Sequence, residues 1–189
     1  MNSASDAPTP VQTVAVIGAG AAGRSFAFSC AAAGFRVILE DVMPANLRQA
    51  RTEFEQLGPS SDGKLEFAST IESAVREADL VVDFVPDELE SKLEIFCLLD
   101  RMAPPKTVVL TPSNALSITD LASCTYRGER CFAVRGAFPE IADGTVLLLH
   151  APDFDAAALD ATAAFLRALG GSVQVQLDQD APMLVKNQL

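Results

Sequence analysis

Three glycines with a fixed spacing, Gly18, Gly20 and Gly23, have the clearest chemical use in this chain. They follow the apolar run Val14–Ile17 and open a small-residue segment that Gly34 ends. In this pattern the first glycine permits a tight turn, and the second lets backbone N–H groups approach a pyrophosphate. The third lets a helix pack closely on a strand, and the helix N-terminus offers unpaired donors to phosphate groups.

An acidic residue follows at the distance that a dinucleotide site requires. The apolar run Val37–Leu39 leads to Asp41, which lies 23 residues beyond Gly18. An acid at this place can accept a hydrogen bond from the 2′-hydroxyl of an adenosine ribose. Residues 42–44 are Val-Met-Pro and offer no cation to a 2′-phosphate. We therefore predict a dinucleotide site with NAD, rather than NADP, as its cofactor.

Apolar runs alternate with helix-like spacing along the rest of the chain. Beyond the two apolar runs already described, we expect strands at 65–68, 79–85, 107–110, 131–134, 146–149 and 173–177. Helices are expected at 24–33, 44–57, 69–75, 87–102, 117–123 and 154–169. This alternation predicts a single α/β domain with a Rossmann-type, doubly wound, mainly parallel sheet. Residues 1–12 are interpreted as a disordered lead and residues 13–180 as the NAD-binding domain.

Composition limits the partners. A chain of 189 residues suits one domain with a sizeable core. Its net charge of −11 argues against nucleic acid or an anionic membrane surface as a partner, and no apolar stretch approaches the length of a bilayer span. The four cysteines lack metal-site spacing, so we expect no metal, and reduced thiols favour a cytoplasmic location. Cys30 and Cys97 are expected to be buried.

Two longer blocks are more specific than the glycines. One runs from Ser69 to Asp100 and contains Ala-Asp-Leu-Val-Val-Asp-Phe-Val-Pro-Asp at 78–87, and the other runs from Leu116 to Arg130. With the glycine segment they resemble the NAD-binding domain of the L-3-hydroxyacyl-CoA dehydrogenases. The resemblance implies reversible oxidation of a 3-hydroxyacyl-CoA to the 3-oxoacyl-CoA. It also places Asp87 and Lys92 near the cofactor, where the alternatives are a helix N-cap and a solvated helix charge.

The resemblance implies a histidine base, a glutamate that orients it, and a serine and an asparagine that bind the substrate oxygen. In this chain Arg135 takes the histidine position, Leu147 the glutamate position and Asn114 the serine position. Asn187 matches the asparagine. Arginine stays protonated and cannot accept the hydroxyl proton, whereas Asn114 can hydrogen-bond a carbonyl and is also a candidate cofactor residue.

Three functions therefore remain open. The chain is a 3-hydroxyacyl-CoA dehydrogenase relative with impaired catalysis, a non-catalytic NAD(H)-binding or regulatory module, or an oxidoreductase whose Arg135 binds an acidic substrate. His150 is the only histidine, and we expect it at a surface strand end rather than in catalysis. Glu140 and Asp143 follow Arg135 and are expected to be solvated loop acids, with a catalytic role as the alternative.

The family normally continues into an all-helical second domain. From the resemblance we expect residues 181–189 to be the start of the segment that leads to it, with the helical domain itself absent here. We expect an apolar face that this domain would cover, which favours a homo-oligomer or a partner chain. A natural short form and a fragment of a longer chain both fit this end point.

Overall fold

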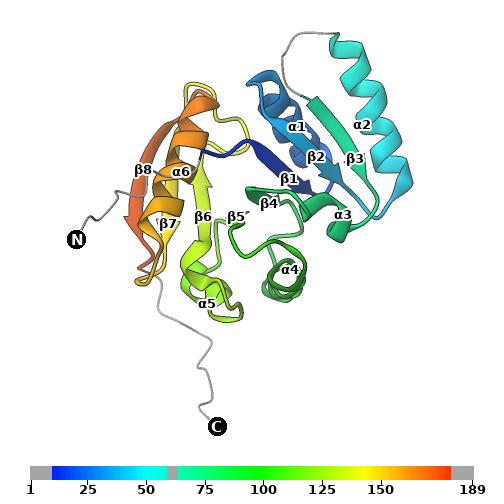
Figure 1. Ribbon diagram of the computed structural model, residues 1–189. Coiled ribbons are helices and arrows are strands. Elements are labelled where there is room, and N and C mark those ends of the chain that lie inside the picture. The colour runs from blue at the N-terminus through cyan, green and yellow to red at the C-terminus, as the bar shows by residue number, and fades with distance from the viewer. Residues whose placement is uncertain (1–9, 59–63, 180–189) are drawn as a thin grey trace, which may run out of the picture.

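The computed structural model describes residues 10–58 and 64–179, and it places one eight-stranded sheet at the centre of the molecule (Figure 1). The strand order is β3-β2-β1-β4-β5-β6-β7-β8. The strands are β1 (Thr13–Ile17), β2 (Arg36–Glu40), β3 (Lys64–Ala68), β4 (Leu80–Asp83), β5 (Val108–Pro112), β6 (Cys131–Gly136), β7 (Thr145–His150) and β8 (Ser172–Leu177). The helices are α1 (Ala21–Ala32), α2 (Pro44–Leu57), α3 (Ile71–Val75), α4 (Leu89–Met102), α5 (Ile118–Ser123) and α6 (Ala156–Ala168), with a 3₁₀ turn at Gly128–Arg130.

Helices cover both faces of this sheet, and a separate core fills each interface. Phe26 of α1, Ala50 of α2 and Leu166 of α6 belong to the core on one face. Val75 of α3, Phe96 of α4 and Leu121 of α5 belong to the core on the other. Because both faces are covered, a central strand such as β1 is buried at every residue and reads in sequence as a continuous apolar run.

The strand order reverses beside β1, which pairs in parallel with β2 on one side and with β4 on the other. In open sheets of this kind, ligands bind in the crevice outside the carboxyl ends of the strands at such a reversal. The predicted Rossmann-type sheet is confirmed, and its glycine turn lies at this point. Among the described residues, no helix is both long enough and apolar enough to cross a membrane.

The direction of β7 is the main feature that the apolar pattern does not reveal. This strand is antiparallel to β6 and parallel to β8, so the sheet is mixed at that edge. The antiparallel register places Arg135 directly opposite Leu147. The positions that the family resemblance assigns to the histidine and the glutamate are therefore paired on adjacent strands.

Several element boundaries differ from the expected ones. Strand β4 ends at Asp83 rather than at Val85, and helix α4 begins at Leu89 rather than at Asp87. Pro86 lies between them, has no N–H to donate, and disfavours helix in the residue before it. The expected burial of Cys30 is confirmed, but that of Cys97 is wrong because its side chain is exposed on α4.

Candidate functional site

The glycine turn joins β1 to α1 at the reversal of strand order. Gly18 has a φ of +100°, which side-chain-bearing residues rarely adopt. A Cβ atom on Gly23 would lie 1.9 Å from the backbone oxygen of Gly18, so any larger residue would push the helix off the turn. A Cβ on Gly20 would meet nothing within 4 Å. Two of the glycines are therefore needed by the fold, and the third leaves open space in front of the turn.

The start of α1 fits a negatively charged ligand. Gly20 is the N-cap residue and makes no side-chain cap, and no acidic side chain lies in the first turn. Unpaired N–H groups at a helix start carry partial positive charge and bind phosphate groups readily. The open space at Gly20 gives a pyrophosphate access to these donors.

Asp41 contacts this turn and is ionised at neutral pH. Its Oδ2 accepts hydrogen bonds from Ala19 N at 2.8 Å and Asn46 Nδ2 at 3.0 Å. Its Oδ1 accepts one from Met43 N at 2.7 Å. Burial alone would raise the pKa of Asp41, but these three hydrogen bonds outweigh it and lower the pKa. A carboxylate is therefore held beside the glycine turn at neutral pH.

Two charged residues at this end of the site were missed by sequence reasoning. Arg24 donates from Nη1 to Ala19 O at 2.8 Å and forms an ion pair with Glu53 at 2.8 Å. Glu40, at the end of β2, accepts from Gly18 N through its backbone oxygen at 2.9 Å. Its side chain is buried, with Oε1 lacking a hydrogen-bond partner, and burial followed by the nearby Asp41 charge raises its pKa to about 7.

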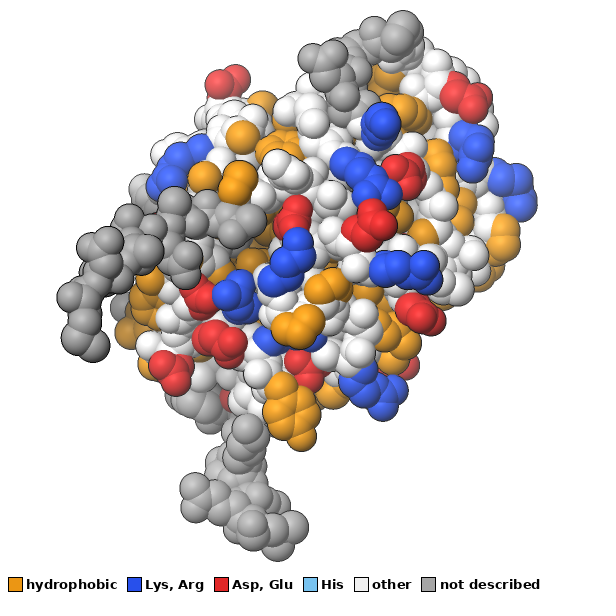
Figure 2. All heavy atoms as spheres, viewed as in Figure 1, with side chains coloured by type: hydrophobic (Ala, Val, Ile, Leu, Met, Phe, Trp, Pro, Cys, Tyr) orange, Lys and Arg blue, Asp and Glu red, His pale blue; other side chains and the backbone are white. Residues whose placement is uncertain are grey.

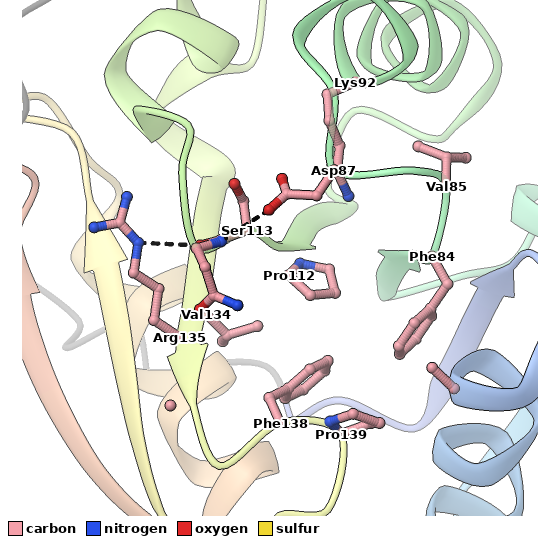
Figure 3. A pocket seen from close by; sticks show the side chains of 13 residues that line it. Phe84, Val85, Asp87, Lys92, Pro112, Ser113, Val134, Arg135, Phe138 and Pro139 are labelled. Carbon is pink, nitrogen blue, oxygen red and sulfur yellow. Dashed lines mark hydrogen bonds between the residues drawn. The ribbon is translucent and has the colours of Figure 1, made fainter.

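A cavity of about 290 Å³ opens at the carboxyl ends of β4, β5 and β6 (Figure 3). One wall is apolar and includes Phe84 and Phe138, whose rings stack with centroids 5.8 Å apart. The lining also includes the polar residues Asp87, Asn114 and Arg135. The structure therefore brings these three predicted site residues together around one cavity, although they lie at the ends of three separate strands.

Lys92 lines the same cavity but is not the solvated charge that was one alternative. Its side chain is fully buried, and its Nζ lies 2.6 Å from Oδ1 of Asp83 at the end of β4. Burial raises the pKa of Asp83, and the Lys92 charge acts against that rise. The solvated-charge alternative is wrong because α4 packs this side chain onto the strand end.

Asp87 is not the N-cap of α4, because that position belongs to Glu88. Its Oδ2 instead accepts a hydrogen bond from Asn114 N at 3.0 Å. This contact joins the segment after β4 to the loop after β5. The N-cap alternative is therefore wrong, and the carboxylate shapes the rim of the cavity.

Arg135 also binds this loop. Its Nε donates to Ser113 O at 3.0 Å and its Nη2 donates to Leu116 O at 2.9 Å (Figure 3 shows the first of these). On the neighbouring strand its partner in register is the apolar Leu147. An arginine held in this way cannot accept a proton, and its counterpart on β7 offers no carboxylate to orient a base.

His150, Glu140 and Asp143 do not line the cavity. His150 pairs with Phe132 near the start of β6, at the opposite end of that strand from Arg135. Its Nδ1 lies 2.8 Å from Ala151 O, and its ring centroid lies 4.1 Å from that of Phe154. Glu140 and Asp143 are exposed on the loop between β6 and β7. Asn187 lies outside the described residues.

Comparison with known proteins decides the family. The family model described as "3-hydroxyacyl-CoA dehydrogenase, NAD binding domain" matches residues 13–181. The chain belongs to this family. The predicted resemblance is confirmed, as is NAD as the cofactor of this domain.

Relatives within this dehydrogenase family are distant in sequence but close in fold. A 3-hydroxybutyryl-CoA dehydrogenase of Bradyrhizobium diazoefficiens is 28% identical over 192 residues, which cover 95% of this chain and 65% of that protein. An L-carnitine dehydrogenase of Burkholderia mallei is 29% identical over 172 residues, covering 86% of this chain and 54% of the relative.

Solved structures are also similar to this chain over most of its length. A diketoreductase with 26% identity superimposes with a TM-score of 0.80 and covers 96% of this chain and 69% of its own. A 3-hydroxyacyl-CoA dehydrogenase of Archaeoglobus fulgidus, with 27% identity, has a TM-score of 0.75 and covers 89% of this chain and 57% of its own. This family member therefore spans between 54% and 69% of the length of these four proteins.

Proposed function

We propose that this chain binds NAD(H) across the glycine turn and is a 3-hydroxyacyl-CoA dehydrogenase relative with impaired hydride transfer to and from 3-hydroxyacyl-CoA substrates. Gly18, Gly20 and Gly23 would hold the pyrophosphate, and Asp41 the adenosine ribose. Asp87, Lys92 and Asn114 would line the other half of the cofactor. NAD(H), when bound, supplies or accepts the hydride, so the chain itself must supply a base for the hydroxyl proton.

The register of β6 and β7 carries the catalytic half of this proposal. Arg135 and Leu147 face each other at the place where the family resemblance implies a histidine and its orienting glutamate. Arg135 binds two backbone carbonyls and stays protonated, and Leu147 has no polar atom in its side chain. A proton released by the substrate hydroxyl has no acceptor in this pair.

Two further points bear on the substrate. The names of the relatives, 3-hydroxybutyryl-CoA dehydrogenase, L-carnitine dehydrogenase and diketoreductase, point to compounds with a hydroxyl or carbonyl group as the substrate class. We further infer that Arg135 is less suited to an acidic substrate than its charge suggests, because its guanidinium already donates to Ser113 O and Leu116 O. Both the impaired dehydrogenase and the non-catalytic module must bind NAD(H), so this binding is the first property to test.

Titration of the protein with NADH, followed by nucleotide fluorescence, tests that requirement. The Asp41→Ala variant should bind NADH at least about tenfold more weakly, because hydrogen bonds to a charged acceptor are each worth roughly 1.5–3 kcal/mol. Asp160→Ala, which removes an exposed acid on α6, is the matched control and should bind as the wild type does. Equal NADH affinity in the wild type and Asp41→Ala would contradict the proposed site.

A further inference from the structure

Side-chain hydrogen bonds from three directions along the chain fix the loop of residues 113–116. Ser113 Oγ accepts from Leu116 N at 2.9 Å, which closes the turn on itself. Asp87 Oδ2 accepts from Asn114 N at 3.0 Å and ties the turn to the segment after β4. These bonds leave the Asn114 side chain exposed at the cavity rim.

Arg135 of β6 is the third group that fixes this loop, after the Ser113 hydroxyl and the Asp87 carboxylate. Its two hydrogen bonds reach the carbonyl oxygens of Ser113 and Leu116, at the two ends of the turn. The guanidinium is planar and always charged, so a pair of such bonds fixes direction as well as distance. Figure 3 shows the Arg135 side chain running along the loop rather than into the centre of the cavity.

The position of the loop in the fold tells which half of a dinucleotide it faces. Asp41 lies beyond β2, on one side of the strand-order reversal, and takes the adenosine half. The loop lies beyond β5 and is joined to the ends of β4 and β6, on the other side. A dinucleotide whose pyrophosphate meets the start of α1 therefore extends its nicotinamide half toward the cavity beside this loop.

We propose that Arg135 is a positioning residue that holds the 113–116 loop, and with it Asn114, against the nicotinamide half of the bound dinucleotide. The inference rests on the proposed binding of NAD(H). It gives the guanidinium a use that differs from both a proton acceptor and an anion clamp. Through its hydrogen bonds Arg135 fixes the position of the loop, and it neither accepts a proton nor binds an anion in this role.

Two nucleotides separate this role from a general effect on folding. NADH contains both halves of the dinucleotide, whereas ADP contains the adenosine and the pyrophosphate but no nicotinamide half. In Arg135→Met the affinity for NADH should fall about tenfold or more, since two charge-assisted hydrogen bonds are lost, while ADP affinity stays within about twofold. Arg135→Lys, which keeps the charge and one or more donors, should recover part of the loss.

Arg130→Met is the matched control. Arg130 forms an ion pair with Asp155 and donates to Lys106 O, away from the cavity-lining residues. Its loss should leave the ratio of NADH to ADP affinity unchanged, even if the melting temperature falls. If Arg135→Met does not fold, the same ratio in Arg135→Lys decides, with a selective loss for NADH expected.

The outcomes distinguish the inference from the function on which it rests. Unchanged NADH affinity in a folded Arg135 variant, or an equal loss for NADH and ADP, overturns the positioning role. A wild-type protein that binds neither NADH nor ADP overturns the proposed function itself.

Discussion

At the scale of single residues, the ionisable groups of this site are more buried than their positions in the sequence suggest. Lys92 and Asp83 form a fully buried ion pair, and Glu40 is 2% exposed with one unpartnered oxygen. A buried charge is costly unless it is paired or neutralised. Lys92 and Asp83 are paired, while the Glu40 carboxyl responds through its raised pKa.

The pKa of Glu40 predicts a pH-dependent stability. Because this pKa is about 7 in the folded protein, above its ordinary value of 4.5, the folded state binds an extra proton between these values. The free energy of unfolding should therefore fall, by at most about 3 kcal/mol, as the pH rises from about 5 to about 8. Urea denaturation at several pH values measures it.

Glu40→Gln isolates the contribution of this residue, because the amide cannot ionise. The difference in stability between wild type and variant should shift in favour of the variant as the pH rises. Asp83, whose pKa is also raised, contributes to both proteins and cancels in that difference. A difference that stays constant from about pH 5 to about pH 8 would contradict this account, because it would show that folding does not raise the pKa of Glu40.

At the scale of elements, the unit from β1 to Asp41 was predictable because its signals are local. A glycine turn, a helix and an apolar strand each depend on neighbours in the chain. The antiparallel direction of β7 was not predictable, since an apolar run does not reveal strand direction. The burial of Lys92 and the bonds of Arg135 depend on partners 9 to 22 residues away, which spacing alone does not identify.

The glycine turn itself makes a prediction at this scale. Gly23→Ala should destabilise the protein and weaken NADH binding together, because its Cβ would lie 1.9 Å from Gly18 O. Gly20→Ala should change stability by only about 1 kcal/mol or less, because its Cβ meets open space, yet should weaken NADH binding by occupying that space. Thermal melts and NADH titrations of both variants measure this. Equal NADH affinity in Gly20→Ala and wild type would mean that the pyrophosphate does not approach this turn.

At the scale of the whole molecule, one mixed sheet brings the ends of β1, β2, β4, β5 and β6 to a common edge, and the two halves of the site share that edge. At one part of that edge lie the residues predicted for the adenosine half, Asp41 and the glycine turn, with Asp41 Oδ2 accepting a hydrogen bond from Ala19 N. The other half combines an apolar wall of Phe84 and Phe138 with a loop that Arg135 holds, and no ionisable pair suited to a proton relay faces Arg135 on β7. We infer that this domain binds NAD(H) but catalyses hydride transfer to and from 3-hydroxyacyl-CoA substrates poorly.

Reduction of acetoacetyl-CoA by NADH is the measurement that tests this inference most directly. With NADH bound, as shown by its fluorescence, the wild-type protein should reduce acetoacetyl-CoA at no more than a trace rate, roughly a hundredfold or more below a typical enzyme turnover of about 10 per second, because an arginine holds the position of the proton donor. Robust turnover of acetoacetyl-CoA would contradict the account and would show that another residue serves as the proton donor.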